Sequence, residues 1–527
     1  MAIIKAPYNF VPLNKKVVSP YWAEYVSHDV PFEDGESGEI EIEITAASPI
    51  FVKGGMGKKE AESYFNNNRQ IKPYRFSQDE NGKFFIPGSS IKGMVRGVLE
   101  IMTFGDLGKK TIDRKYAIRD LSSAMKDKYL SNFSPSTVRC GWLRKKSGGW
   151  NEDSKYEIID CGIPGRISHE SLQREFNVGI SSYFKKGGGF RPSNDFEKSS
   201  MKKYQMWGDT DLNNHFVLDH ETAGRMVYEV NKSGQPGTLV FTGQPGYRQQ
   251  VRDRKTGEMK WTGHHLEFIF WEGVRQVDIA PDVMKGFLDA YFEYDSTQWS
   301  EDWKVRREEL SNGKRIPVFF CVDNDGNVLH LGLSYLYKLP FKHSIKEAAD
   351  KFQLKKEGAL DFSDAIFGFV PEKGSMSEKE KLKGRVHFSN AFELNSVEES
   401  HAVSAVLSSP KASYYPNYIR QKVNKGKVNR YASLFDEEPE LSGWKRYPVH
   451  RQIEIGTAEN ENDRILTSFI PLKKGAKFKC TIKYHNLKRI EIGALLSALT
   501  FHNTPQTYHG IGMGKPLGLG KIELNVS

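Results

Sequence analysis

The chain has 527 residues and a formal net charge of +10, from 76 Lys and Arg residues against 66 Asp and Glu residues. The length allows two to four domains, and the moderate positive charge suits a polyanionic partner. The four cysteines fit neither a zinc pattern nor a disulfide framework, no stretch is long and apolar enough to span a membrane, and the first residues lack a signal peptide. We therefore expect a protein of the reducing cytoplasm, with no metal or other cofactor.

The first hundred residues alternate between irregular and strand-like patterns. Residues 1–37 contain scattered prolines and predict an extended N-terminal arm. From residue 38, Ile40, Ile42 and Ile44 alternate with glutamates, which predicts a half-buried strand with a charged outer face. This strand leads into the turn Gly54-Gly55.

The stretch from Phe84 to Glu100 predicts a strand, a turn and a helix. Pro87 and Gly88 form the turn, and Ser89 and Ser90 are residue types that cap helix N-termini. Lys92 and Arg96 are four residues apart and therefore share one face of the helix. The stretch is either an ordinary capped helix with a basic face or a phosphate site built from these cations and free N–H groups.

The remaining chain divides by composition. Frequent glycine and proline turns between short alternating runs predict a β-rich inserted region at residues 105–360, with one helix from Val283 to Tyr294. Strand and helix patterns resume at 361–527. This last part includes a basic, tyrosine-bearing excursion at about 409–447, which contains Lys411 and ends in Gly443-Trp444-Lys445-Arg446-Tyr447.

A glycine-rich loop at residues 510–521 precedes the last strand. It contains Gly510, Gly512, Gly514 and Gly518 together with Lys515 and Lys521. Glycine allows close approach to a ligand or to another chain segment. The loop is either a structural hairpin or an anion-contacting segment, and the two lysines and Pro516 favour anion contact. It is not a Walker loop, because no Ser or Thr follows Lys515 and a strand, not a helix, follows the loop.

Four short sequence segments, which we call the sequence blocks, occur in the same order in one known family. They are Gly54-Gly55, the segment from Ile86 to Gly93 with Arg96, the pair formed by Ile366-Phe367-Gly368 and the segment from Gly384 to Ala391, and the loop from Gly510 to Lys521. The chain resembles the RAMP superfamily of CRISPR-associated proteins, in particular the backbone subunits of type III effector complexes. The segments at Ser409-Pro410-Lys411 and Gly443–Tyr447 resemble the larger RAMP proteins of type III-D loci.

The resemblance implies an α+β core of ferredoxin-like or RRM-like fold, formed by residues 38–104 and 361–527 and interrupted by the insertion. It implies a guide-RNA-binding subunit that acts in antiviral defence, with CRISPR RNA, complementary target RNA and other RAMP and large subunits as partners. The excursion and the insertion are both candidates for the hairpin thumb that kinks the guide–target duplex in such subunits. The RNA-binding residues that we expect are Gly54, Gly55, Ser89, Ser90, Lys92, Arg96, Arg385, Lys411, Gly510, Gly512, Gly514, Lys515, Gly518 and Lys521.

One departure concerns catalysis. Catalytic subunits of the family carry an aspartate in the loop before the Pro-Gly-Ser-Ser helix, whereas the corresponding segment here, residues 66–73, has no carboxylate. Metal-assisted cleavage needs an anionic ligand or a base, so we expect RNA binding without cleavage.

Three alternatives remain open. Glu60, Glu62 or Asp79 could substitute for the missing aspartate and make the subunit a target-cleaving endoribonuclease. His502 and His509 are the only histidines near the glycine loop that could serve a CRISPR-RNA-processing ribonuclease. An assembly protein, which uses the insertion for protein contacts only, is the third.

Overall fold

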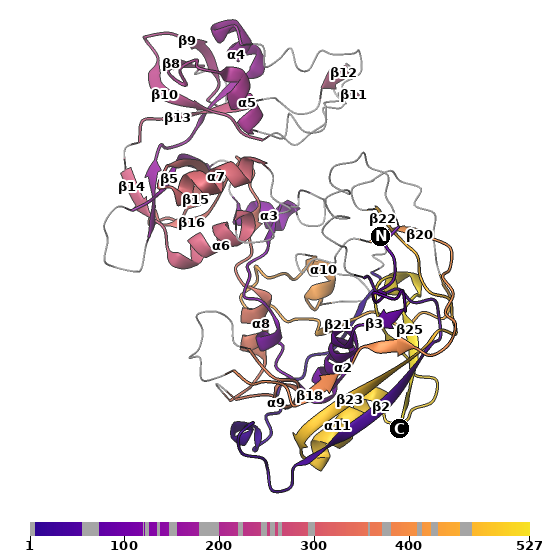
Figure 1. Ribbon diagram of the computed structural model, residues 1–527. Helices are drawn as coiled ribbons and strands as arrows, with labels where there is room; N and C mark the ends of the chain where they lie inside the picture. Colours follow the sequence, from indigo (N-terminus) through magenta and orange to yellow (C-terminus); the bar gives the residue numbers. More distant parts are fainter. Residues whose placement is uncertain are drawn as a thin grey trace. The chain divides into compact units, whose positions relative to one another are not determined.

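The computed structural model describes two compact units (Figure 1). Unit 1 comprises Met1–Ile112, Ile345–Ser433 and Glu438–Ser527, and unit 2 comprises Asp113–Ser344 and Leu434–Glu437. The residues described are 6–54, 73–119, 121, 126–133, 137–146, 155–178, 200–219, 225–243, 250–252, 259–261, 266–273, 275–292, 301–356, 359–370, 381–407, 414–422, 431–453 and 466–527.

Unit 1 is built on a seven-stranded sheet whose described neighbours are antiparallel. Along the sheet the strands follow the order β24-β25-β2-β23-β19-β3, and β18 also pairs with β23. Their bounds are β2 (Glu36–Ala46), β3 (Phe85–Ile86), β18 (Val386–Phe388), β19 (Ala391–Glu393), β23 (Lys477–Leu487), β24 (His509–Gly510) and β25 (Lys521–Val526).

Two helices, α2 (Gly88–Met102) and α11 (Arg489–Thr500), pack against each other and contribute to one core with the sheet (Figure 1). In chain order the elements are β2, α2, β18 with β19, β23, α11 and β25, while the strands lie in the order β25-β2-β23-β18/β19. This is the strand–helix–strand–strand–helix–strand arrangement of the ferredoxin-like fold. The predicted α+β, ferredoxin-like class is therefore confirmed.

The sequence pattern explains how these elements face the core. Ile42 and Ile44 of β2 are fully buried, whereas the glutamates between them lie on the opposite face, as expected for a strand period of two. Along α2, Ile91, Val95 and Leu99 repeat every four residues and are fully buried. The predicted strand at residues 40–44 and the predicted helix after Pro87 are both confirmed.

The other described elements of unit 1 are smaller. Two pairs of short strands lie apart from the main sheet: β1 (Asn9–Val11) pairs with β21 (Trp444–Arg446), and β20 (Val403–Val406) pairs with β22 (Leu466–Phe469). The helical elements are η1 (Ala23–Tyr25), η2 (Gly108–Lys110), α8 (Ile345–Phe352), α9 (Phe362–Phe367), α10 (Tyr415–Tyr418) and η7 (Lys515–Leu517).

Unit 2 contains two five-stranded antiparallel sheets, ordered β7-β13-β10-β8-β9 and β14-β6-β5-β15-β16, and two short pairs, β4 with β17 and β11 with β12. The strands are β4 (Ala117–Ile118), β5 (Arg139–Lys145), β6 (Tyr156–Asp160), β7 (Gly165–Ser168), β8 (Asn213–Leu218), β9 (Val227–Val230), β10 (Gln235–Val240), β11 (Gln250–Arg252), β12 (Met259–Trp261), β13 (Leu266–Trp271), β14 (Arg275–Asp278), β15 (Ile316–Val322), β16 (Val328–Gly332) and β17 (Leu339–Pro340). The helices are α3 (Lys126–Asn132), α4 (His169–Phe176), α5 (Ser200–Trp207), α6 (Pro281–Tyr291) and α7 (Glu301–Ser311).

Unit 2 is rich in strands, in agreement with the pattern of its sequence. The helix predicted at Val283–Tyr294 is α6, and its Met284 and Phe287 are buried in the core of unit 2. The boundaries of this unit, near residues 113 and 344, lie inside the predicted limits of 105 and 360. That the region is an insertion into a RAMP core stays a prediction.

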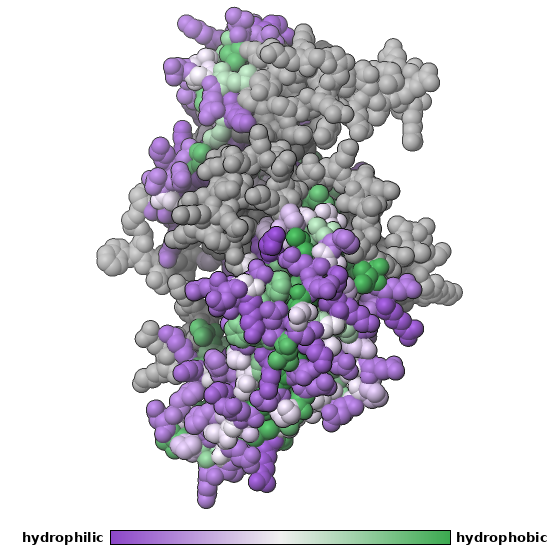
Figure 2. Space-filling model, turned by 45° about the vertical axis from the view of Figure 1, so that its right-hand side comes forward, coloured by the Kyte–Doolittle hydropathy of each residue, from purple (hydrophilic) through white to green (hydrophobic). Residues whose placement is uncertain are grey.

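On the part of the surface that Figure 2 colours, hydrophilic side chains cover most of the area and hydrophobic ones occur in small groups. Among the described residues, none of the helices is both long and apolar enough to cross a membrane.

Candidate nucleic-acid interface

The start of α2 is fixed by the neighbouring strand. The Gly88 N–H donates to Asn390 Oδ1 at 3.0 Å. A Cβ atom built on Gly88 would lie 2.2 Å from the carbonyl oxygen of Phe388, so only glycine allows the two backbones to come this close. The Pro-Gly turn thus docks the helix on the break between β18 and β19.

The serines after this turn do not cap the helix. Pro87 occupies the N-cap position and makes no side-chain hydrogen bond, so the prediction that Ser89 or Ser90 is the N-cap is wrong. The N–H groups of Ser90 and Ile91 donate to the Pro87 carbonyl. The first turn therefore offers an anion fewer free donors than the sequence indicated.

Lys92 and Arg96 share one side of α2, as their spacing predicted. Their charged groups lie 5.9 and 6.0 Å from the centroid of the Phe367 ring in α9. Lys92 Nζ donates to the Phe367 carbonyl at 3.3 Å, and Lys92 makes no ion pair with the described residues. Burial, and then the charge of Arg96, lower the pKa of Lys92. Lys92 is therefore a partly buried cation whose charge is not neutralised.

Arg96, in contrast, belongs to a buried acidic network. Its guanidinium donates to Glu100 Oε1 at 2.8 Å and to Asp364 Oδ1 at 3.1 Å. Lys110 also pairs with Asp364. Burial, and then the charge of Asp361, raise the pKa of Asp364. Arg96 thus links α2 to α9, and its charge is largely neutralised by these carboxylates of the protein itself.

The glycine-rich loop is shaped by contacts within the chain. Gly512, Gly514 and Gly518 have positive φ angles between 72° and 83°. A Cβ on Gly512 would lie 2.0 Å from the Phe51 carbonyl oxygen, and one on Gly518 would lie 2.4 Å from the Gln452 carbonyl oxygen. These glycines are required by the fold itself, which is the structural interpretation of the loop.

Gly510 and Lys515 differ from these three glycines. A Cβ on Gly510 would meet only the Lys515 side chain within 4 Å. Lys515 Nζ donates to the Gly512 carbonyl. Burial, and then the charges of Arg446 and Lys445, lower the pKa of Lys515. The loop therefore presents a cation whose nearest charged neighbours are also cations.

These three cations, Lys445, Arg446 and Lys515, form what we call the cation cluster. Burial lowers the pKa of each, opposed at Arg446 by the charge of Glu100, and none makes an ion pair with the described residues. Arg446 Nη1 lies 3.2 Å from the Cβ position of Gly97, so the cluster borders α2. Desolvated charges of one sign are unfavourable unless an opposite charge is bound beside them. The cation cluster is therefore the strongest anion-binding feature of unit 1.

The comparisons identify the family. The model of the RAMP superfamily matches residues 43–293 and 278–523. The chain belongs to the RAMP superfamily. No curated protein matches it. One matching solved structure is described as "Cryo-EM structure of the Type III-B Cmr-beta bound to cognate target RNA". Its chain is 10% identical, the match covers 94% of this chain and 98% of that one, and the TM-score is 0.21. This score is too low to support an argument about fold or function.

In this RAMP protein, Arg385 lies inside the core. Its side chain is fully buried, it pairs with Glu491, and Nε donates to the Ala365 carbonyl at 2.9 Å. The guanidinium also donates to the Asn486 carbonyl. Arg385 therefore joins the start of β18 to α9 and α11, and its side chain is buried in the core instead of lying at the surface.

Of the remaining predicted residues, Gly54 and Lys521 are not members of the cation cluster, although Lys521 lies opposite Gly510 in the sheet, and others lie outside the described residues. Gly54 N–H donates to the Arg75 carbonyl at 3.3 Å, and Lys521 Nζ lies 3.9 Å from the centroid of the Tyr508 ring. Gly55, Lys411, Glu60 and Glu62 are outside the described residues.

Two residues considered for catalysis have structural roles. Asp79 Oδ1 accepts hydrogen bonds from the Asn81 and Lys83 N–H groups, which closes a turn. His509 is 2% exposed and shares a hydrogen bond with the Leu499 carbonyl through Nε2. Burial lowers the pKa of His509 to about 4. Neither position resembles an exposed general base or metal ligand, and no cluster of three or more metal-binding side chains occurs among the described residues.

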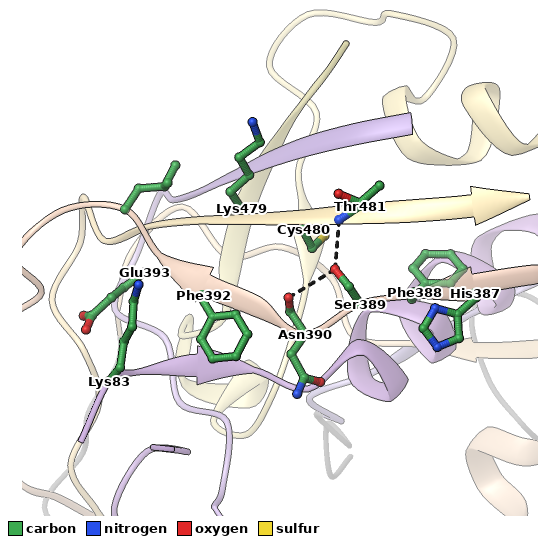
Figure 3. A pocket seen from close by; sticks show the side chains of 11 residues that line it. Lys83, His387, Phe388, Ser389, Asn390, Phe392, Glu393, Lys479, Cys480 and Thr481 are labelled. Carbon is green, nitrogen blue, oxygen red and sulfur yellow. Dashed lines mark hydrogen bonds between the residues drawn. The ribbon is translucent and has the colours of Figure 1, made fainter. Parts of the chain in front are cut away.

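A shallow cavity of about 640 Å³ lies on the open face of the sheet, which is the face opposite to α2 and α11, and the start of α2 lies close to its lining residue Asn390 (Figure 3). Its polar groups are mostly used by the protein: Thr481 N–H donates to Ser389 Oγ at 2.9 Å, and Lys479 pairs with Glu41 at 2.9 Å. The sequence predicted none of its lining residues as a site. Lys83 also lines it, with Nζ 5.8 Å from the centroid of the Phe392 ring, but among its described lining residues there is no group of several cations like the cation cluster.

Sequence reasoning brought Lys515 and the α2 cations into the site but did not select Lys445 and Arg446. The signal was present in Trp444-Lys445-Arg446-Tyr447, where two aromatic residues flank two adjacent cations. What it could not show is that β21 lies beside both α2 and the glycine-rich loop.

Proposed function

We propose that this chain is an RNA-binding subunit of a type III CRISPR ribonucleoprotein and that unit 1 holds the backbone of a guide RNA. Membership of the RAMP superfamily and the four sequence blocks support the assignment. The observation that carries it is the cation cluster, because three desolvated cations without carboxylate partners suit a polyanion.

The surface suits backbone contact more than recognition of base sequence. Lys92 lies on the adjoining helix as a further unpaired cation. Contacts to phosphates position an RNA strand but carry no sequence information. In the proposed complex the guide reads the target RNA by base pairing, and other RAMP and large subunits complete the assembly.

The experiment compares two sets of lysine and arginine substitutions in the full chain. Lys445→Gln, Arg446→Gln and Lys515→Gln together remove the cation cluster. Lys477→Gln, Lys479→Gln and Lys483→Gln remove three cations that are already paired with glutamates on the open face. Binding of an unstructured 30-nucleotide RNA is measured over a range of salt concentrations.

We expect the cluster variant to bind RNA at least 30-fold more weakly and its salt dependence to fall by about 0.7 per lost phosphate contact. The open-face variant should change the affinity less than threefold. Equal losses in the two variants would contradict the proposal, and so would wild-type protein that does not bind RNA.

We propose further that this subunit does not cut target RNA, because Asp79 closes a turn and residues 66–73 contain no carboxylate. The test is incubation of the assembled complex with target RNA and Mg²⁺. A specific cut that disappears with Glu60→Ala, Glu62→Ala or Asp79→Ala would show that the subunit is a nuclease.

A further inference from the structure

Four aromatic rings lie beside the cation cluster, and we call them the aromatic cluster: Tyr8, Phe10, Tyr418 and Tyr447. The Tyr8 ring centroid lies 6.1 Å from that of Tyr447 and 5.9 Å from that of Tyr418. The Phe10 and Tyr418 centroids are 5.2 Å apart. All four residues are partly exposed. They are therefore a surface feature and not an extension of the hydrophobic core.

The pairing of β1 with β21 creates this arrangement. Asn9 lies opposite Arg446 and Phe10 opposite Lys445 in the antiparallel register. The residues just beyond these pairs, Tyr8 and Tyr447, consequently meet at the end of the ladder. A segment near residue 8 thereby supplies half of a site whose other half comes from β21.

Cations and rings are interleaved in the combined site. Lys445 Nζ lies 5.5 Å from the Tyr8 centroid and 5.4 Å from the Tyr447 centroid, and Lys515 Nζ lies 6.0 Å from the Tyr447 centroid. Such distances allow cation–π attraction. No carboxylate pairs with the two lysines among the described residues. The site thus combines positive charge for a phosphate with flat rings for a base.

We propose that the aromatic cluster and the cation cluster together hold one unpaired nucleotide of the bound RNA. The base stacks on the tyrosine rings, and the adjoining phosphates lie against Lys445, Arg446 and Lys515. This inference rests on the proposed function and adds that the ligand at this position is single-stranded.

The chemistry favours an unpaired nucleotide over other anions. The faces of aromatic rings are electron-rich and do not attract carboxylates, so an acidic peptide gains little from the tyrosines. A base inside a duplex has both faces covered by its neighbours. Every unpaired base has a free face for stacking, and such contacts are tolerant of sequence.

The first test separates stacking from charge by the salt dependence of RNA binding. In the full chain, Tyr8→Leu and Tyr447→Leu are each expected to weaken binding of the 30-nucleotide RNA at least fivefold at every salt concentration, without changing the slope. Lys445→Gln should instead lower the slope by about 0.7. Tyr8→Phe and Tyr447→Phe keep the rings and should bind within twofold of wild type.

Phe392→Leu is the matched control, because Phe392 is a partly exposed aromatic residue in the cavity of the open face. It should change the affinity less than twofold. Thermal unfolding of every variant shows whether a loss of binding reflects a loss of folding, and the Tyr→Phe variants keep the test informative if a leucine variant unfolds.

The second test removes bases from the ligand. A fully abasic strand of the same length keeps the ribose-phosphate backbone of the RNA but has no bases. Wild-type protein should bind this strand at least fivefold more weakly than intact RNA. Tyr447→Leu should bind the two ligands nearly equally.

Wild-type affinity for RNA in the tyrosine-to-leucine variants, or equal affinity of the wild-type protein for intact and abasic RNA, would overturn the inference. The proposed function would stand in that case, provided that the cation-cluster variant still loses binding. Poly-glutamate that competes as well as RNA would overturn both.

Discussion

The open face of the sheet and the cation cluster both present three basic side chains, but the charges beside them differ. On the open face, Lys477, Lys479 and Lys483 of β23 each lie 2.8 to 2.9 Å from a glutamate of β2. In the cation cluster no such pair exists among the described residues: the charges that act on Lys515 are those of Arg446 and Lys445, and only Arg446 is also influenced by a carboxylate, that of Glu100. The same residue types therefore make one neutral surface and one positive surface.

This difference shows why net charge alone does not locate a polyanion site. Exposed ion pairs contribute little stability, but they cancel the field that would attract a phosphate. Unpaired cations keep that field, but their desolvation and mutual repulsion lower the stability of the protein without a ligand. Each prediction below changes a charge or its pairing and measures whether stability or RNA binding responds.

The largest effect is expected where a cation is both buried and paired. Arg385→Met leaves Glu491 buried without its partner and should lower the free energy of unfolding of unit 1 by about 3 to 5 kcal/mol. Urea unfolding measures the loss. Arg385→Met with Glu491→Gln should recover part of it. A loss below about 1 kcal/mol in the single variant would show that this pair does not support the fold.

The second effect concerns a histidine that the fold keeps neutral beside the cation cluster. Burial, opposed by the hydrogen bond to Leu499 and assisted by the charge of Arg446, lowers the pKa of His509 from 6.5 to about 4. A lowered pKa means that the unfolded chain binds the proton first, so stability is lost as the pH falls from about 6.5 towards 4. The full loss is about 3 kcal/mol.

Hydrogen exchange of residues 509–526 between pH 7 and pH 4.5 measures this loss within unit 1. His509→Asn removes the titrating group and should flatten the pH dependence of exchange. An equally steep dependence in the variant would assign the effect to other groups.

The third prediction converts the neutral surface into a positive one. Glu39→Gln, Glu41→Gln and Glu43→Gln together free the three lysines of β23. RNA affinity at 50 mM salt should rise up to about tenfold, and the salt dependence should steepen by up to about 2. Filter binding of the full chain measures both. Unchanged affinity would mean that the position of a cation matters more than its pairing.

The smallest effect is expected from Lys515→Gln in the absence of RNA. Its Nζ loses a hydrogen bond to the Gly512 carbonyl, but the repulsion from Arg446 and Lys445 disappears. The two changes should cancel to within about 0.5 kcal/mol. Thermal unfolding tests this, with Gly510→Ala as a neighbouring control. A clear destabilisation would assign Lys515 to the fold instead of to a ligand.

Local sequence patterns were sufficient for the core of unit 1. The isoleucine alternation of β2, the apolar face of α2 and the apolar helix at α11 each follow from residues close together in the chain. Their order along the chain, together with the resemblance, led to the ferredoxin-like class. Charge pairing was not accessible in this way, because Arg385 meets Glu491 and Arg96 meets Asp364 only after folding.

The glycine-rich loop is a second case in which local sequence could not predict contacts that form only after folding. Its composition suits either a ligand or a close backbone contact, and only the positions of Phe51 and Gln452 show which glycines the chain itself requires. The cation cluster depends on β21 reaching both α2 and this loop. No periodicity within residues 443–447 could have shown that.

The register of β1 with β21 also bears on how the chain is synthesised. Asn9 is synthesised long before its partner Arg446. In the same way β2 is synthesised long before its neighbour β23, which begins at Lys477. Unit 2 is almost entirely one continuous stretch, Asp113–Ser344, and can fold on the ribosome well before then. Unit 1 is thus completed last, and a chain truncated before residue 477 contains all of unit 2 but lacks β23 and β25, the two strands that flank β2 in the sheet of unit 1.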